Sequence, residues 1–89
     1  MLYLSTKQKK NLKKLTKRNN TAILREKLQE ELNELHDALA LGNKENIIEE
    51  IADVYILINQ YTTKYKLKRK ISKQVTFKIN RTLKLFKML

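Results

Sequence analysis

The stretch TAILREKLQEELNELHDALALGN, residues 21–43, decides the fold because it has the pattern of one long amphipathic helix. Thr21 is a candidate N-cap, and Gly42 stands where a helix favours a residue in the left-handed conformation. Between them the leucines recur every three or four residues, which places on one face of a helix Leu24, Leu28, Leu32, Leu35 and Leu39. We therefore expect a helix from about Ala22 to Leu41.

The rest of the chain predicts three more helices. It has one Gly and no Pro, so the usual signals of strands and tight turns are almost absent. Apolar periodicity indicates helices over about 6–18, from after Asn43 to about 63, and over about 71–87, with KYKLKRK at 64–70 as an exposed connector. The residues expected to point inward in the last two helices are Ile47, Ile51, Val54, Ile58 and Tyr61, then Ile71, Val75, Ile79 and Phe86.

These elements indicate one all-α domain spanning residues 1–89, a four-helix-type bundle. Its core is expected at about 21–87, preceded by a basic N-terminal helix at about 5–18 in which Ser5 and Gln8 form a candidate capping box. A chain of 89 residues leaves little margin for a self-sufficient core, so we expect a homodimer or homotetramer.

Charge is distributed unevenly along the chain. There are 20 Lys and Arg residues against nine Asp and Glu, and all nine acids lie between Glu26 and Asp53. The absence of Cys excludes disulfides and zinc–thiolate sites. The longest unbroken apolar run, Val54–Ile58, is far too short to cross a bilayer, and the N-terminus lacks the pattern of a signal sequence. We therefore expect a cytoplasmic protein with no membrane partner.

The acidic residues have a spacing that suggests a site. Only Gly42 and Asn43 separate the second and third helices, so these helices should pack as an antiparallel hairpin. Four carboxylates can then converge, from Glu31, Glu34, Glu50 and Asp53. Acidic groups at the edge of a core repel each other and lose hydration, which a bound cation relieves. Oxygen ligands without His or Cys favour Mg²⁺ or Mn²⁺.

These residues resemble a known signature. Glu30-Glu31-x-x-Glu34, followed after sixteen residues by Glu50-x-x-Asp53, looks like the EExxE…ExxD pattern of the MazG-like, all-α nucleoside triphosphate pyrophosphohydrolases. Two basic features match as well: Lys27 before the paired glutamates, and Lys78-x-x-Arg81 near the C-terminus. The resemblance covers about residues 24–85.

The resemblance implies an activity and a role for each matched residue. Members of the family use Mg²⁺, for which Mn²⁺ is a potential substitute, to convert an NTP or dNTP into the monophosphate and pyrophosphate, and they assemble as dimers or tetramers. By this resemblance the metal ligands would be Glu31, Glu34, Glu50 and Asp53. The catalytic carboxylates would be Glu30, Glu31 and Glu34, with Glu30 assisting a second metal or orienting the attacking water. The phosphate-binding residues would be Lys27, Lys78 and Arg81.

Three other interpretations remain open. The acids could form a solvated helix face, in which Lys27 pairs with Glu31 one turn later. The basic ends could bind nucleic acid, with the acidic hairpin serving as a scaffold; such binding would need no metal and would weaken steeply with salt. The chain could also be a catalytically inactive MazG-like interaction module. There is no Trp, and no residue matches the family's base pocket, so the pattern predicts no preferred base.

Overall fold

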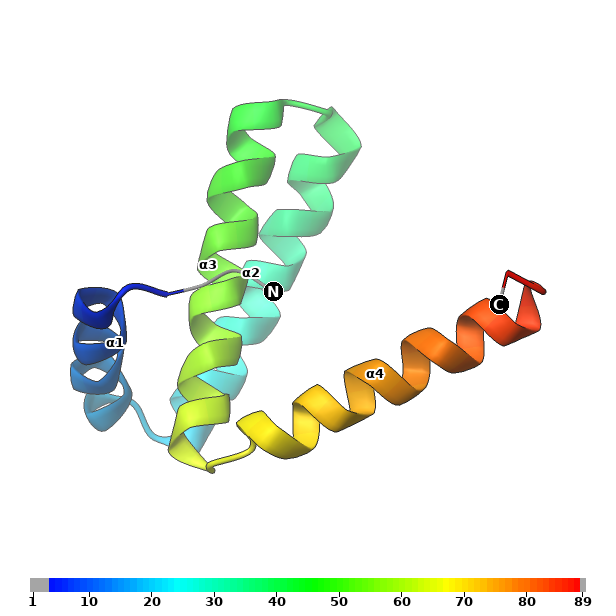
Figure 1. Cartoon of the computed structure of the whole chain (residues 1–89). Helices are drawn as coiled ribbons and strands as arrows, with labels where there is room; N and C mark the ends of the chain where they lie inside the picture. Colours follow the sequence, from blue (N-terminus) through cyan, green and yellow to red (C-terminus); the bar gives the residue numbers. More distant parts are fainter. Residues whose placement is uncertain (1–3, 89) are drawn as a thin grey trace.

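The computed structural model describes residues 4–88 and contains four α-helices, with no strand in that part of the chain (Figure 1). The helices are α1 (Thr6–Arg18), α2 (Thr21–Leu41), α3 (Lys44–Lys64) and α4 (Lys68–Leu85). The prediction of an all-α fold is confirmed. No helix within residues 4–88 combines the length and hydropathy needed to cross a membrane.

Side-chain caps explain where the first two helices begin. Before α1, Ser5 Oγ accepts a hydrogen bond from the Gln8 amide at 3.1 Å, and Gln8 Oε1 accepts one from the Ser5 amide at 2.7 Å. The predicted capping box is therefore confirmed. The N-cap of α2 is Asn20 rather than Thr21, because Asn20 Oδ1 accepts the Ile23 amide at 2.9 Å and the helix begins one residue earlier than expected.

Two residues make the tight connection between α2 and α3. Gly42 adopts a left-handed conformation with φ of 75°, and its amide donates to the Ala38 carbonyl at 3.0 Å. Asn43 then caps α3 by accepting the Asn46 amide at 3.1 Å. A loop this short makes the helices antiparallel neighbours, as predicted, and they form the unit that we call the α2–α3 hairpin.

The contact between α2 and α3 does not run along the middle of the predicted stripes. The buried apolar side chains of the chain's described part are Leu24 and Ala38 of α2, and Val54 and Leu57 of α3. Several stripe residues expected inside are exposed: Leu32, Leu39, Ile51, Ile58 and Tyr61. On α2 the contact with α3 is made by Leu24, Glu31 and Ala38, which are seven residues apart. This line lies to one side of Leu32 and Leu39, and it includes a carboxylate.

Helix α1 packs against α3, through polar contacts. Gln60 and Thr16 are buried, and Asn19 Nδ2 donates to Gln60 Oε1 at 2.9 Å. Lys64 Nζ donates to the Asn19 carbonyl at 2.8 Å, and Thr16 Oγ1 donates to the Leu12 carbonyl at 2.8 Å. The two bonds made by Asn19 hold the end of α1 against the last turns of α3, while the Thr16 bond lies within α1.

Helix α4 points away from the hairpin (Figure 1) and has no buried side chain. The prediction that Ile71, Val75, Ile79 and Phe86 point into the subunit core was wrong: Ile71 is half-buried and the other three are exposed. The connector is also shorter than expected, since α4 already begins at Lys68.

The backbone turn at Lys66 sets the direction of α4. Lys66 is left-handed with φ of 54°, its amide donates to the Thr63 carbonyl, and the Leu67 amide donates to the Thr62 carbonyl. This pair of bonds is the Schellman arrangement that ends a helix. It ends α3 and starts α4 in a new direction.

Candidate metal centre

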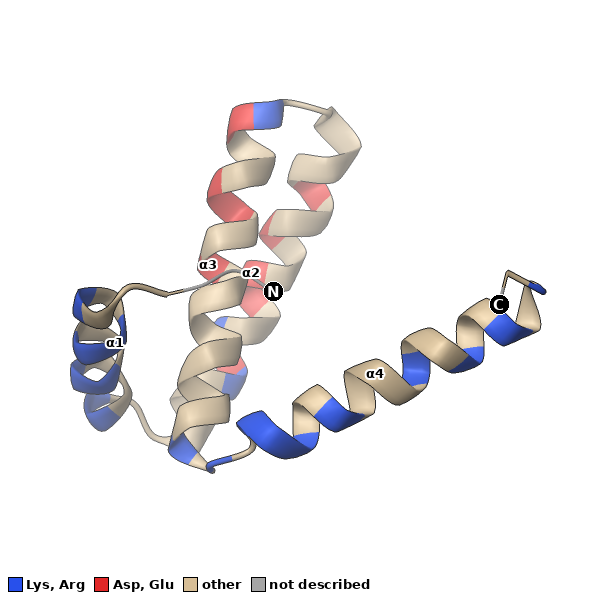
Figure 2. Cartoon of the chain, in the orientation of Figure 1, with Lys and Arg blue, Asp and Glu red and all other residues tan. Residues whose placement is uncertain are grey.

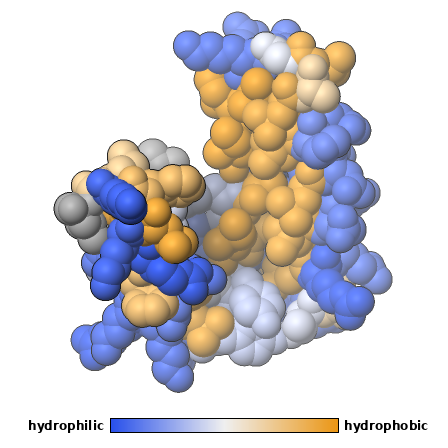
Figure 3. All heavy atoms as spheres, turned by 90° about the vertical axis from the view of Figure 1, so that its right-hand side faces the viewer, coloured by the Kyte–Doolittle hydropathy of each residue, from blue (hydrophilic) through white to orange (hydrophobic). Residues whose placement is uncertain are grey.

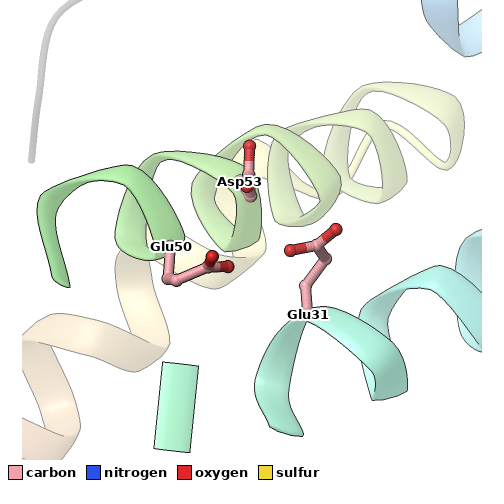
Figure 4. Close-up of side chains that lie close together, drawn as sticks. All are labelled: Glu31, Glu50 and Asp53. Carbon is pink, nitrogen blue, oxygen red and sulfur yellow. The ribbon is translucent and has the colours of Figure 1, made fainter. Parts of the chain in front are cut away.

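Three carboxylates meet in the middle of the α2–α3 hairpin (Figure 4). Glu31 comes from α2, and Glu50 and Asp53 come from α3. Each offers one oxygen, and the three oxygens lie within 4.8 Å of one another. All three side chains are half-buried. The expectation that acids of the two helices face each other is confirmed for these three residues.

The helical register explains why these carboxylates lie in the contact. Glu31 is seven residues after Leu24 and seven before Ala38, and both of these side chains are buried. Glu50 is seven residues before the buried Leu57. Residues seven apart occupy nearly the same side of a helix, two turns along. Packing of the apolar residues therefore forces Glu31 and Glu50 into the seam between the helices.

The close approach changes the proton affinity of the carboxyls. Burial raises the pKa of Glu31 from its ordinary value of 4.5 to about 7, and hydrogen bonding to Glu34 and the negative charges of Glu34 and Asp53 add to this effect. The pKa of Glu50 is also raised, first by burial and then by the charge of Glu34. Near neutral pH Glu31 therefore binds a proton far more readily than an ordinary glutamate does.

Two oxygens of the cluster have no hydrogen-bond donor. They are Glu31 Oε2 and Glu50 Oε2, and both are inaccessible to solvent. A contact between two carboxyls becomes a hydrogen bond only when one of them holds a proton. Buried carboxylate oxygens without donors are satisfied equally well by a hard divalent cation.

The donor set fits Mg²⁺ or Mn²⁺. Oxygens bound to one Mg²⁺ at about 2.1 Å lie at most about 4.2 Å apart. The present limit of 4.8 Å is therefore within a small side-chain adjustment of a shared cation. Glu31, Glu50 and Asp53 supply only oxygen, which excludes the nitrogen and sulfur ligands that zinc prefers.

A comparison with protein families agrees with this geometry. Residues 3–71 match the phosphoribosyl-ATP pyrophosphohydrolase family. The chain belongs to this family. Membership makes the chain a hydrolase of the pyrophosphohydrolase type, and it confirms the predicted kinship with the MazG-like all-α enzymes. No curated protein and no solved structure matches the chain significantly.

The other predicted residues of α2 are exposed and do not belong to the cluster. Glu34 is exposed, yet its charge acts on both Glu31 and Glu50, so it lies close to the carboxylates. Glu30 and Lys27 are exposed on the same helix. In residues 4–88 the one ion pair joins His36 and Asp37, so Lys27 does not form the pair with Glu31 that the solvated-face interpretation requires.

The structure does not bring Lys78 and Arg81 to the carboxylates. Both lie on α4, which stands apart from the acidic part of the hairpin (Figure 2). The Arg81 guanidinium instead lies 5.8 Å from the centre of the Phe77 ring, one turn earlier on the same helix. The family match ends at residue 71, so it does not include either of these residues.

Sequence analysis missed the position of α1 relative to the site. Gln60, which holds α1 through Asn19, is seven residues after Asp53 and so lies on the same side of α3. The cluster therefore opens toward the side of the hairpin that carries α1, a helix with seven Lys or Arg residues and no acid (Figure 2). The available signal was Gln60 itself, a polar residue one turn beyond the buried Leu57.

Proposed function

We propose that the chain is a Mg²⁺-dependent nucleoside triphosphate pyrophosphohydrolase that converts an NTP or dNTP into the monophosphate and pyrophosphate. The observation that carries this proposal is the meeting of Glu31, Glu50 and Asp53 across α2 and α3, with two buried oxygens that lack donors. Family membership supports the reaction type. A chain without Cys is compatible with action in the reducing cytoplasm, where nucleotides are found.

In this proposal Glu31, Glu50 and Asp53 hold Mg²⁺, with Glu34 as a fourth ligand after a change of rotamer; Mn²⁺ is the expected substitute. The ion would supply charge neutralisation at the phosphates and a more acidic water. Glu34 and Glu30, within one turn of Glu31 on α2, would accept a proton from the attacking water and orient it.

Positive side chains would hold the polyphosphate. A triphosphate carries about four negative charges, and nearby cations stabilise the charge that accumulates on departing pyrophosphate. Lys27 is on the same helix as Glu31, and the cations of α1 lie on the side to which the cluster opens. This position gives the surplus of Lys a role, since a positive field concentrates an anionic substrate near the site.

For Lys78 and Arg81 the support is the resemblance of their spacing. Helix α4 stands apart from the cluster. Lys78 and Arg81 can therefore bind the substrate's phosphates only if α4 comes close to the carboxylates. Lys78→Ala and Arg81→Ala should then raise KM and leave Mg²⁺ affinity unchanged, whereas Lys84→Ala, also basic and exposed on α4, should change neither. Equal KM values in all three variants would remove these two residues from the site.

The proposed reaction releases pyrophosphate, so its substrate must carry a triphosphate. Phosphoribosyl-ATP, the substrate in the family's name, carries the triphosphate that the proposal requires. The experiment is therefore pyrophosphate release from a panel that contains phosphoribosyl-ATP, all canonical NTPs and dNTPs and common damaged nucleotides, each with Mg²⁺, Mn²⁺ or EDTA. Metal-dependent release from at least one compound is expected.

Matched variants connect this activity to the site. Glu50→Gln and Asp53→Asn should abolish turnover, while Glu49→Gln, an exposed acid beside Glu50, should retain it. If no compound is hydrolysed, and if the protein instead binds nucleic acid without metal and with a steep salt dependence, the basic ends would be the functional surface.

A further inference from the structure

Helix α4 has an apolar side and a basic side. Apolar residues that recur every three or four positions form one side, which we call the α4 stripe: Ile71, Val75, Ile79, Leu83 and Phe86. On the opposite side of the helix lie Arg69, Lys70, Lys73, Arg81 and Lys84. The exceptions are Lys68, at the first position of the helix, and Lys78, at the edge of the stripe. The helix is therefore amphipathic, and its polar side is positively charged.

The α4 stripe is uncovered in the structure. Helix α4 points away from the α2–α3 hairpin (Figure 1) and has no buried side chain. The exposed fractions of Val75, Ile79 and Phe86 are 48, 54 and 71%. A hollow of about 230 Å³ lies along the first turns of the helix, lined by Leu67, Lys70, Ile71, Gln74, Val75 and Lys78. Leu67 is the N-cap of α4 and the others lie within it, so no other helix of the described chain lines the hollow.

Charge distinguishes α4 from the other apolar surface of the chain. Figure 3, seen from the right-hand side of Figure 1, shows hydrophobic side chains along the α2–α3 hairpin as well. The hairpin, however, contains all nine Asp and Glu residues, whereas α4 has seven Lys and Arg residues and no acid (Figure 2). An anionic surface would therefore attract α4 and repel the hairpin.

We propose that α4 lies along the surface of an anionic lipid bilayer, with its stripe among the acyl chains and its basic side at the phosphates of the headgroups. Such a surface places negative charge above an apolar layer, which matches the two sides of the helix. Lys68 and Lys78 still reach the headgroups, because a lysine stem extends along apolar surface while its ammonium stays in water. The expectation of no membrane partner followed from the lack of a spanning segment, which a helix lying on the surface does not need.

The composition of α4 favours lipid over nucleic acid. Nucleic acid would neutralise the cations through its phosphates but would leave the α4 stripe in water. About four to eight Lys and Arg residues on an amphipathic helix are instead typical of helices that bind anionic lipid. The family match ends at residue 71, so most of α4 lies outside the part of the chain that defines the family. The partner of α4 is therefore inferred from the helix's own residues, and it goes beyond the proposed function.

Vesicle flotation measures the binding of the full chain. The chain should float with vesicles of phosphatidylcholine and phosphatidylserine, and it should not float with vesicles of phosphatidylcholine alone. Ile79→Ser removes apolar surface from the stripe and should weaken binding by about tenfold. Lys73→Gln should weaken binding by roughly fivefold, whereas Lys44→Gln, at an exposed lysine that starts α3, should not change it. Far-UV circular dichroism verifies that each variant is helical, and the α4 substitutions remove no buried side chain.

Tryptophan fluorescence tests which side of α4 enters the bilayer, because the chain has no Trp of its own. Ile79→Trp places the reporter on the stripe. Phe77→Trp, two residues earlier, places it on the opposite side of the helix, about 200° away. Phosphatidylserine vesicles should shift the emission of the Ile79→Trp variant to shorter wavelength and protect it from quenching by iodide. The Phe77→Trp variant should show neither change.

Three results would overturn the proposal. The first is equal flotation, or none, with the two kinds of vesicle. The second is binding to single-stranded DNA that Phe77→Ser abolishes and Ile79→Ser does not, which would make the basic side a nucleic-acid surface. The third is protection of the Ile79→Trp reporter before vesicles are added, which would mean that protein covers the stripe: a second copy if the protection depends on concentration, the same chain if it does not. None of these assays uses nucleotide hydrolysis, so their outcome is independent of the proposed function.

Discussion

Replacing Glu31 by Gln should stabilise the metal-free protein at alkaline pH and abolish its stabilisation by Mg²⁺. In the folded protein burial and neighbouring carboxylates raise the pKa of Glu31 to about 7, against an ordinary value of 4.5. A raised pKa means that the folded state binds the proton more tightly than the unfolded chain does. This contribution to stability is complete below pH 4.5 and is lost as the pH rises through about 7.

The size of the effect follows from the difference between these values. At about 1.4 kcal/mol per pH unit, the difference between about 7 and 4.5 gives an upper limit of about 3.4 kcal/mol. Glu31 is half-buried, so solvent screens part of the interaction, and we expect about 1–2 kcal/mol. Gln has nearly the shape of the protonated carboxyl and no charge, so the variant does not lose stability as Glu31 ionises.

The assay is urea unfolding of wild type and Glu31→Gln in EDTA at about pH 5 and about pH 8.5. The difference in unfolding free energy between variant and wild type should grow by about 1–2 kcal/mol at the higher pH. Glu26→Gln, an exposed acid of the same helix, should show no such growth. Mg²⁺ should stabilise wild type at the higher pH, because the ion replaces the proton, and should not stabilise Glu31→Gln. An equal pH dependence of wild type and Glu31→Gln would refute the reasoning.

Two further predictions concern the fold. Leu57→Ala, at a site 8% exposed, should lower the unfolding free energy by roughly 2–5 kcal/mol, whereas Ile51→Ala, at a site 47% exposed on the same helix, should lower it by less; equal losses would contradict this. Lys66→Gly should stabilise the protein by about 1 kcal/mol, because Gly adopts a left-handed φ without strain, while Lys70→Gly, inside α4, should destabilise it by about as much; chemical denaturation distinguishes the two signs.

Helix positions could be predicted from sequence because their signals are local. Ser5 and Gln8, Gly42 and Asn43 each act on the backbone within a few residues, and the structure uses all four at helix ends. The direction of α4 could not be predicted in this way. It depends on a left-handed Lys66, and Lys carries no signal for that conformation.

The acidic centre was predictable in part, because the spacing of acids within each helix is also a local signal. Spacing places Glu31, Glu50 and Asp53 on adjoining sides of a hairpin, and the structure brings them together. Spacing does not determine which turn of a helix is solvated, so Glu34 was expected to converge with the other three carboxylates and is exposed beside them. Whether Lys78 and Arg81 reach the carboxylates depends on how α4 packs relative to α2 and α3. No local sequence pattern specifies that packing.

The most direct test of the account is where a divalent cation binds. Mn²⁺ is paramagnetic and broadens the amide NMR signals of residues near it. Small additions should broaden the signals around Glu31 in α2 and around Glu50 and Asp53 in α3 before those of the hairpin loop at Gly42, and Mg²⁺ should restore them. Glu50→Gln should lose this selectivity. Broadening that is uniform, or that is centred elsewhere on the chain, would contradict the claim that these three carboxylates form the metal centre.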